Sequence, residues 1–336
     1  MQPRSLAILL VFWLVLVLSV VPCFGQSEPP AASSPEPSSS TEPSSPTAPS
    51  PAAAQPPTPV PDLTPGPDGK LSQEQMQQLL RVVADKDLEN DKRQRDYTYV
   101  EREVQNKLDG GGNVKSTEVK TYDVLEIYDE QVQRLIEKDD KPLDAKAAAK
   151  EDEKIQKIID KRKDESEEAR KKREEMEEKD REDERKFVRE VADAYNFTLV
   201  GTESIDGREA WVIEGEPRPG FEPHMKESKF LSKFRGRVWI DQGDLQLAKM
   251  DVEAIDTVSI GLFLARVHKG TRFMLEQTRV NDEVWLPRHL TFKFDARLAL
   301  VKEYNISGEQ NYRDYKKFRA SSKIVGVGEI KDPEQK

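Results

Sequence analysis

The chain offers few side chains of the kinds that bind metals. It has three histidines, His224, His268 and His289, and none of them has a second histidine at the short spacing that metal sites use. His224 lies near Glu222 and Glu227, which would make at most a weak site. The sequence therefore predicts no metal centre.

The motifs that mark common catalytic and nucleotide-binding sites are also missing from the sequence. It contains no G-x-S-x-G, no Walker loop and no G-x-G-x-x-G. Carboxylates are plentiful, but most belong to one charged segment, where no apolar wall would raise their pKa. Because nothing pairs a nucleophile with a base, we expect a protein that is not an enzyme and uses no cofactor.

The N-terminal segment is typical of an exported protein. Residues 1–25 contain Arg4, then an apolar run from Leu6 to Val21, then small residues before Gln26, which predicts a signal peptide. Two alternatives remain open: an uncleaved anchor, or lipidation at Cys23, the only cysteine. We expect an exported protein of the periplasm or cell envelope, held to the membrane by its N-terminus if the leader is retained or lipidated.

Composition separates the rest of the chain into tether, domain and tail. Residues 26–68 are rich in Pro, Ser and Ala, and 14 of the chain's 22 prolines lie between Pro29 and Pro67. Such a segment cannot bury enough apolar area to order itself, so we predict a disordered linker. We place the folded domain at 69–320 and a flexible tail at 321–336. The formal net charge of −10 argues against a nucleic-acid partner.

The folded domain begins with a predicted helix and strand hairpins. Ser72 is a good N-cap. A glycine-rich turn at 109–112 and a pair of aspartates at 139–140 predict turns between the strands that follow. The helix is amphipathic, because four apolar residues recur at helical spacing: Met76, Leu79, Leu80 and Val83.

Residues 143–195 predict a helical insertion, since they contain no Gly and no Pro. Between Lys161 and Lys186, 23 of 26 residues are charged, and opposite charges recur at i,i+4. This stretch has no apolar stripe to bury, whereas both flanks carry apolar residues. We predict one long helix or a helical hairpin with packed ends and a solvated middle. A partner-binding arm, of the coiled-coil kind, is the alternative.

Strands account for the remainder. Gly236–Ala254 predicts a strand, a turn at 241–244 and a second strand, and apolar residues alternate with polar ones along Leu290–Leu298. No βαβ rhythm occurs. The predicted fold class is α+β: a curled antiparallel β-sheet of nine or ten strands, forming an open half-barrel, with an N-terminal helix and a long charged helical insertion set against one face.

The apolar faces of these strands are wide for the helices available to cover them. Such a face either fills as an ordinary core or leaves a cavity for an apolar ligand, and both interpretations stay open. The candidate lining residues are Val238, Ile240, Met250, Val252, Phe273, Leu275, Phe292 and Phe294.

Three short segments resemble one known family. Gly236–Glu253, "GRVWIDQGDLQLAKMDVE", is similar to a strand–turn–strand stretch of the outer-membrane lipoprotein-sorting superfamily, which includes LolA- and LolB-like proteins. Gly207–Pro217 and Asn281–Phe292 resemble a strand and a later hairpin of the same family. The similarity covers Ser72–Asp140 and Asn196–Phe318, and the charged helix and Pro-rich tether depart from the family pattern.

The resemblance implies an unclosed half-barrel whose apolar inside shields an acyl chain from water. We therefore expect an exported, non-catalytic envelope protein that binds or carries a lipid or lipoprotein acyl chain. A second partner, an envelope protein, would bind the charged helix. The alternative is a structural or interaction scaffold with a filled core, positioned in the envelope by the charged helix and the tether.

Overall fold

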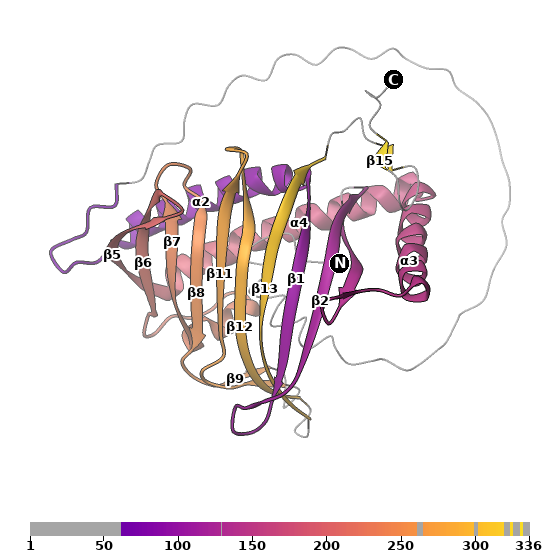
Figure 1. The fold of residues 1–336 in the computed structure, drawn as a ribbon. Coiled ribbons are helices and arrows are strands. Elements are labelled where there is room, and N and C mark those ends of the chain that lie inside the picture. The colour runs from indigo at the N-terminus through magenta and orange to yellow at the C-terminus, as the bar shows by residue number, and fades with distance from the viewer. Residues whose placement is uncertain are drawn as a thin grey trace, which may run out of the picture.

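The computed structural model describes residues 62–128, 130–260, 265–298, 302–318, 323–324 and 330–331. The predicted signal peptide, most of the predicted linker and most of the predicted tail lie outside these residues. Figure 1 shows a wide antiparallel sheet with helices packed behind it.

In the described residues, consecutive strands are mostly joined as hairpins. One helix precedes the first strand, two helices follow the fourth strand, and a short 3₁₀-helix (Glu227–Lys233) follows the sixth. The strands are β1 (Tyr97–Leu108), β2 (Val114–Ile127), β3 (Glu130–Lys138), β4 (Lys141–Pro142), β5 (Tyr195–Ile205), β6 (Arg208–Pro217), β7 (Phe234–Asp241), β8 (Leu247–Ala254), β9 (Val258–Ile260), β10 (Ala265–Val267), β11 (Arg272–Val280), β12 (Val284–Leu298), β13 (Lys302–Lys317), β14 (Lys323–Ile324) and β15 (Ile330–Lys331).

These strands form one sheet of 13 members and a separate pair, β14–β15. The order across the large sheet is β4-β3-β2-β1-β13-β12-β11-β8-β7-β6-β5, with β10 pairing to β12 and β9 to β10. In the part of the chain that the structure describes, the end strands β4 and β5 do not pair with each other, so the sheet is open, as the sequence predicts. The strand number exceeds the predicted nine or ten because β4, β9 and β10 are too short to leave a clear pattern in the sequence.

Helix α2 (Gln73–Gln94) begins where the sequence predicts. The Ser72 hydroxyl accepts a hydrogen bond from the backbone N–H of Gln75, and the Gln75 side chain accepts one from the backbone N–H of Ser72. This reciprocal capping box satisfies donors that the first helical turn would otherwise leave free. The predicted apolar stripe, including the fully buried Met76 and Leu79, packs on the sheet.

The charged insertion folds as a helical hairpin of α3 (Ala145–Lys163) and α4 (Glu167–Ala194). The helical pattern is interrupted at residues 164–166, where the Ser166 hydroxyl caps α4 by accepting a hydrogen bond from the N–H of Ala169. The helix also ends before Tyr195, which the sequence pattern included in it and which instead begins β5.

The two ends of α4 differ in how they are held. Most side chains between 167 and 186 are exposed, including Met176, and neighbouring charges pair along the helix, as in Lys186–Asp183 at 2.8 Å. Such exposed pairs stabilise a helix only weakly, because water and salt screen them. The C-terminal end is anchored by apolar contacts of Phe187, Val191 and Ala194 with α2 and the sheet.

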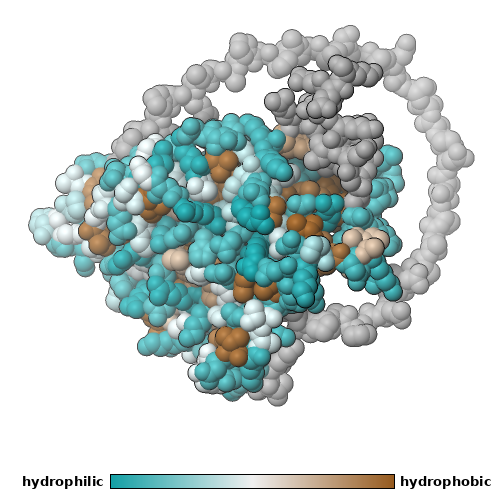
Figure 2. Space-filling view, in the orientation of Figure 1, coloured by the Kyte–Doolittle hydropathy of each residue, from teal (hydrophilic) through white to brown (hydrophobic). Residues whose placement is uncertain are grey.

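Helices α2 and α4 pack against the same side of the sheet, here called the inner face (Figure 1). The main core cluster lies between them and strands β5–β8, and it contains Leu79 from α2, Phe187 from α4 and Ile213 from β6. The opposite, outer face is largely hydrophilic, with apolar residues scattered over it (Figure 2). One-sided polarity is what the period-two strand pattern predicts.

Helix α3 departs from the predicted arrangement, in which the helices lie on one face. It packs through Ile155 on Ile127 and Val132, with Leu125 beside them. Leu125 and Ile127 alternate along β2 with the inner-facing Val124, so α3 covers a corner of the outer face. None of the helices in the described residues combines the length and apolar character that a membrane span requires.

Gly308 makes one close contact on the inner face possible. It pairs across the ladder with Phe292, whose ring lies over it. A Cβ atom at position 308 would come within 2.6 Å of that ring, and it would come closer still to the carbonyl oxygen of Val104. Only a glycine lets the Phe292 ring lie against the strand here.

We expect Gly308→Ala to lower the free energy of unfolding by about 2 kcal/mol, because the added methyl must displace either the Phe292 ring or the backbone of β1. Gly110→Ala is the matched control, since a Cβ there meets no atom within 4 Å. Urea unfolding of both variants measures the difference. Equal stabilities would show that the strand at Gly308 accommodates a side chain.

Candidate ligand-binding face

The structure brings the eight predicted lining residues together on the inner face of four adjacent strands, β7, β8, β11 and β12. Five of them are buried: Ile240, Met250, Leu275, Phe292 and Phe294. The other three, Val238, Val252 and Phe273, are half-buried and pack at the edge of the main core cluster.

One row of these residues runs across the sheet rather than along a strand. Val252 on β8 pairs with Phe273 on β11, which pairs with Phe292 on β12. We call these three residues the apolar strip. Phe273 contacts both the cluster under the helices and the cluster of Leu275, Leu290 and Phe292, so the strip connects these two buried clusters.

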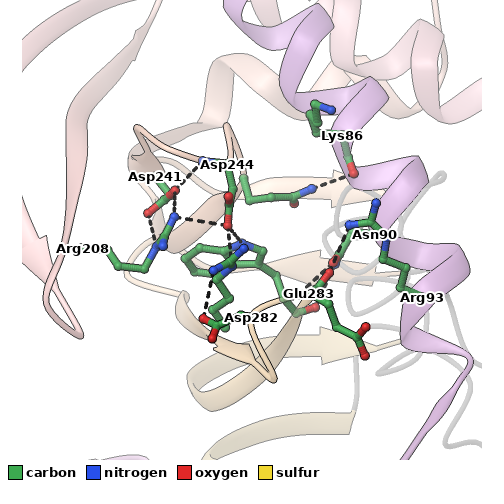
Figure 3. A network of polar contacts seen from close by, with 11 residues as sticks. Lys86, Asn90, Arg93, Arg208, Asp241, Asp244, Asp282 and Glu283 are labelled. Carbon is green, nitrogen blue, oxygen red and sulfur yellow. Dashed lines mark hydrogen bonds and ion pairs between the residues drawn. The ribbon is translucent and has the colours of Figure 1, made fainter. Parts of the chain in front are cut away.

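A polar clamp fixes the C-terminal half of α2 to the sheet (Figure 3). The Asn90 side chain donates to the Trp285 carbonyl and accepts from the Trp285 N–H, both at 2.8 Å. Gln94 donates to the same carbonyl, and Gln246 donates to the Lys86 carbonyl at 2.6 Å. Asn90 thus pairs with β12 as a neighbouring strand would, which sets the line that α2 follows across the inner face.

Charged residues hold the sheet side of this clamp. Arg208 forms two hydrogen bonds of 2.7 Å with Asp241, at the predicted turn after β7. Asp244 in the same turn accepts from the Trp285 indole N–H at 2.9 Å and pairs with Arg279 at 2.8 Å. The predicted strand–turn–strand segment is therefore tied to the strand that holds α2.

Beyond β12 the inner face changes from apolar to polar and aromatic. Tyr312 on β13 lies opposite Glu101 on β1, and Glu101 lies opposite Tyr122 on β2. These residues and their inner-face neighbours form what we call the tyrosine–glutamate patch: Tyr99, Glu101, Glu103, Tyr122, Tyr312 and Tyr315.

The rings of the patch contact one another. The centroid of Tyr99 lies 5.9 Å from that of Tyr312 and 5.4 Å from that of Tyr315, distances at which aromatic pairs attract. Tyr312 also packs against the Leu275, Leu290 and Phe292 cluster. The patch and the apolar strip are therefore neighbours on one continuous surface.

Burial changes the acid–base behaviour of the patch. It raises the pKa of Glu101 from its ordinary 4.5 to about 7, with a smaller upward effect of Glu103 on the Glu101 pKa. Burial also raises the pKa of Glu103, which lies near Lys120, and the pKa of the Tyr99 phenol. On α2, burial and then the charge of Asp91 raise the pKa of the half-buried Asp87 to about 7.

The patch was not predicted as a functional site from the sequence. A signal for it exists in the strand Tyr97–Leu108, where Tyr97, Tyr99, Glu101 and Glu103 alternate with outward residues. Period two places these rings and carboxylates on one face. Nothing in the strand itself shows that this face lies beside Phe292, because that contact depends on β13 lying between β1 and β12.

The three histidines lie apart from one another, each near a different carboxylate. His224 sits 3.5 Å from Glu190 of α4, His268 lies 2.9 Å from Asp295, and His289 lies 3.6 Å from Glu309 on the outer face. The described residues hold no group of three or more His, Cys, Asp or Glu side chains placed to bind a metal ion.

A recess of about 760 Å³ lies elsewhere, at the N-terminal end of α2. Its walls come from the segment before the helix and from the start of β5, and they include Asp68, Lys70, Gln73 and Asn196. The lining is mostly polar and contains none of the eight predicted residues. This recess therefore differs in place and chemistry from the predicted apolar site.

No protein family profile matches this chain, and no curated protein sequence matches it. Solved structures are similar to it. They include a LolA superfamily protein, NE2245, from Nitrosomonas europaea, with 10% identity, a TM-score of 0.29, and coverage of 73% of this chain and 93% of that one.

A putative outer membrane lipoprotein-sorting protein domain from Vibrio parahaemolyticus has 12% identity, a TM-score of 0.27, and coverage of 73% and 95%. A DUF1329 family protein from Desulfovibrio piger has 11% identity, a TM-score of 0.25, and coverage of 73% and 95%. Two of the three carry the name of the superfamily that the sequence resembles.

Removing the clamp should loosen α2. We expect Asn90→Ala to lower the free energy of unfolding by about 2 to 3 kcal/mol, because the Trp285 N–H is left buried without a partner. Gln94→Ala removes only a second donor to a carbonyl that Asn90 still satisfies, so its cost should stay below about 1 kcal/mol. Chemical denaturation measures both, and equal losses would contradict a special role for Asn90.

The raised pKa of Glu101 makes the stability of the protein depend on pH. Between pH 4.5 and about 7 the folded protein holds a proton on Glu101 that the unfolded chain releases, so this residue destabilises the fold more as the pH rises through that window. Glu101→Gln should therefore be more stable than the parent by about 2 kcal/mol at pH 8, with no gain at pH 4.

Urea unfolding at pH 4 and pH 8 tests this expectation. Glu309→Gln, on the outer face of the neighbouring strand β13, is the matched control. A Glu101→Gln stability that differs from the parent by the same amount at both pH values would contradict the assignment.

Proposed function

We propose that the protein is an exported, non-catalytic binding module of the cell envelope that holds the acyl chain of a lipid or lipoprotein on the inner face of its open sheet. The eight predicted residues form the lining: Val238, Ile240, Met250, Val252, Phe273, Leu275, Phe292 and Phe294. The chain would enter where these residues are only half-buried.

The observation that carries the proposal is the apolar strip. Val252, Phe273 and Phe292 are aligned across three adjacent strands, and the first two are half-buried. An apolar row with half-buried members offers a contact surface to a flexible alkyl chain.

The chemistry of the strip suits an alkyl ligand. Each methylene group that leaves water for an apolar surface contributes about 0.8 kcal/mol, and this contribution has no directional requirement. A chain of several methylenes can thus be held without a specific polar contact. The envelope location rests on the predicted leader, and a lipid is a ligand available there.

The alternative, a structural or interaction scaffold, is favoured by a different observation. Under α2 and α4 the inner face is closely filled, with Leu79, Met76 and Ile240 almost fully buried. In that function the exposed charges of Lys161–Lys186 would bind an envelope partner. A scaffold of this kind would hold no lipid, and its capture of the partner would depend on the charged helix.

Binding of an uncharged lipophilic dye separates the two functions. Full-length protein should raise the fluorescence of N-phenyl-1-naphthylamine with saturable binding. Val252→Thr, which puts a hydroxyl of almost unchanged shape into the apolar strip, should weaken that binding about fivefold. Native mass spectrometry of protein purified from its own envelope should also show a retained lipid.

Val114→Thr is the matched control, because Val114 is 57% exposed in the hairpin between β1 and β2, away from the strip. Its dye affinity should equal that of the parent. Protein that binds no dye and retains no lipid would overturn the carrier function and leave the scaffold. Equal weakening by both variants would place the dye outside the strip.

A further inference from the structure

The tyrosine–glutamate patch lies at the far end of the surface on which the acyl chain is proposed to bind. Leu290 on β12 pairs with Gln310 on β13, and Gln310 pairs with Glu103 on β1. From β8 to β1 there are four inter-strand steps, about 19 Å at about 4.8 Å per step. A single extended amphiphile can therefore contact the strip with its tail and the patch with its head.

Glu101 is the most buried acidic residue of the patch, and it has no cationic partner among the residues that the structure describes. It is 5% exposed. Among the described residues, its carboxylate accepts one hydrogen bond, from Gln133 at 2.9 Å, and forms no salt bridge with a Lys or Arg. Buried carboxylates in proteins are normally paired with a cation, so a ligand cation would supply what the chain itself does not.

The hydroxyls of the tyrosines are directed at acceptors within the protein. The Tyr312 hydroxyl donates to Gln310 at 2.8 Å, the Tyr315 hydroxyl donates to the Pro287 carbonyl, and the Tyr99 hydroxyl faces Gln131 at 3.4 Å. With these hydroxyls directed at protein acceptors, the faces and edges of the rings remain beside Glu101. Aromatic faces next to a carboxylate favour an organic cation, whose charge they attract and whose carbon atoms they bury.

Other head groups fit the patch less well. An anionic head group would meet Glu101 and Glu103 and be repelled. A small metal ion requires more carboxylate or imidazole ligands than the described residues bring together. Lys120 lies near Glu103, which leaves Glu101 as the carboxylate whose charge is uncompensated.

We propose that the tyrosine–glutamate patch binds the ammonium head group of an amphiphile whose alkyl tail lies on the apolar strip. The contacts come from four of its residues: Glu101, Tyr99, Tyr312 and Tyr315. This inference rests on the proposed function, because it assigns the head-group chemistry to the same ligand. It makes the protein selective for amine-bearing lipids or alkylamines over acidic or neutral ones.

Three probes with the same twelve-carbon tail test the selectivity: dodecylammonium, dodecyl maltoside and dodecanoate. Each displaces N-phenyl-1-naphthylamine from the full-length protein at concentrations below micelle formation. Dodecylammonium should compete about tenfold better than dodecyl maltoside, and dodecanoate should compete worst.

Single substitutions then distinguish binding of the ammonium head group from binding of the alkyl tail. Glu101→Gln should lower the affinity for dodecylammonium about tenfold and leave that for dodecyl maltoside unchanged. Tyr312→Leu should also lower the ammonium preference, whereas Tyr312→Phe, which keeps the ring, should retain it. Glu309→Gln on the outer face of β13 is the control and should change neither affinity.

The outcomes distinguish this inference from the function on which it rests. If the three probes compete equally and Glu101→Gln has no effect, the ammonium site is wrong while the acyl-chain function stands. If Val252→Thr weakens all three probes alike, the shared tail site is supported. If none of the probes binds, the acyl-chain function fails and the ammonium site fails with it.

Discussion

The pair of hydrogen bonds between Asn90 and the Trp285 backbone controls how the inner face is divided. It fixes the C-terminal half of α2 to β12, while the Ser72 capping box fixes where the helix begins beside β5. Between these two points α2 can cover only the strands under its path. Val252 and Phe273 of the apolar strip are half-buried at the edge of the main core cluster that α2 covers.

The division of the inner face has an energetic consequence. Under the helices the surface is apolar and closely packed, which contributes stability through burial. Beyond β12 the same surface carries Glu101 and Tyr312, and the buried carboxylate costs stability at neutral pH.

The charged helical hairpin is held to the sheet differently from α2. The first half of α4 has no apolar stripe, and its exposed ion pairs are individually too weak to seat it on the sheet. Phe187 and Val191 anchor the second half, because burying their side chains against α2 removes apolar surface from water and stabilises the contact. The result is a solvated arm attached at its ends.

The sequence by itself determined the local structure. The cap at Ser72, the turns at 109–112, 139–140 and 241–244, and the alternation from Leu290 to Ala296 all follow from preferences of residues close together in the chain. It also placed the two predicted lining residues of each of the four strands on one face of that strand, because period two is a property of each strand.

Only the tertiary structure decided what those faces meet. Asn90 and Trp285 are 195 residues apart, and Glu101 comes to lie near Phe292 because β13, from the end of the domain, pairs between β1 and β12. Contacts of this kind depend on strand order, which no local preference encodes. The extent of helix cover and the burial of Glu101 were decided at that level for the same reason.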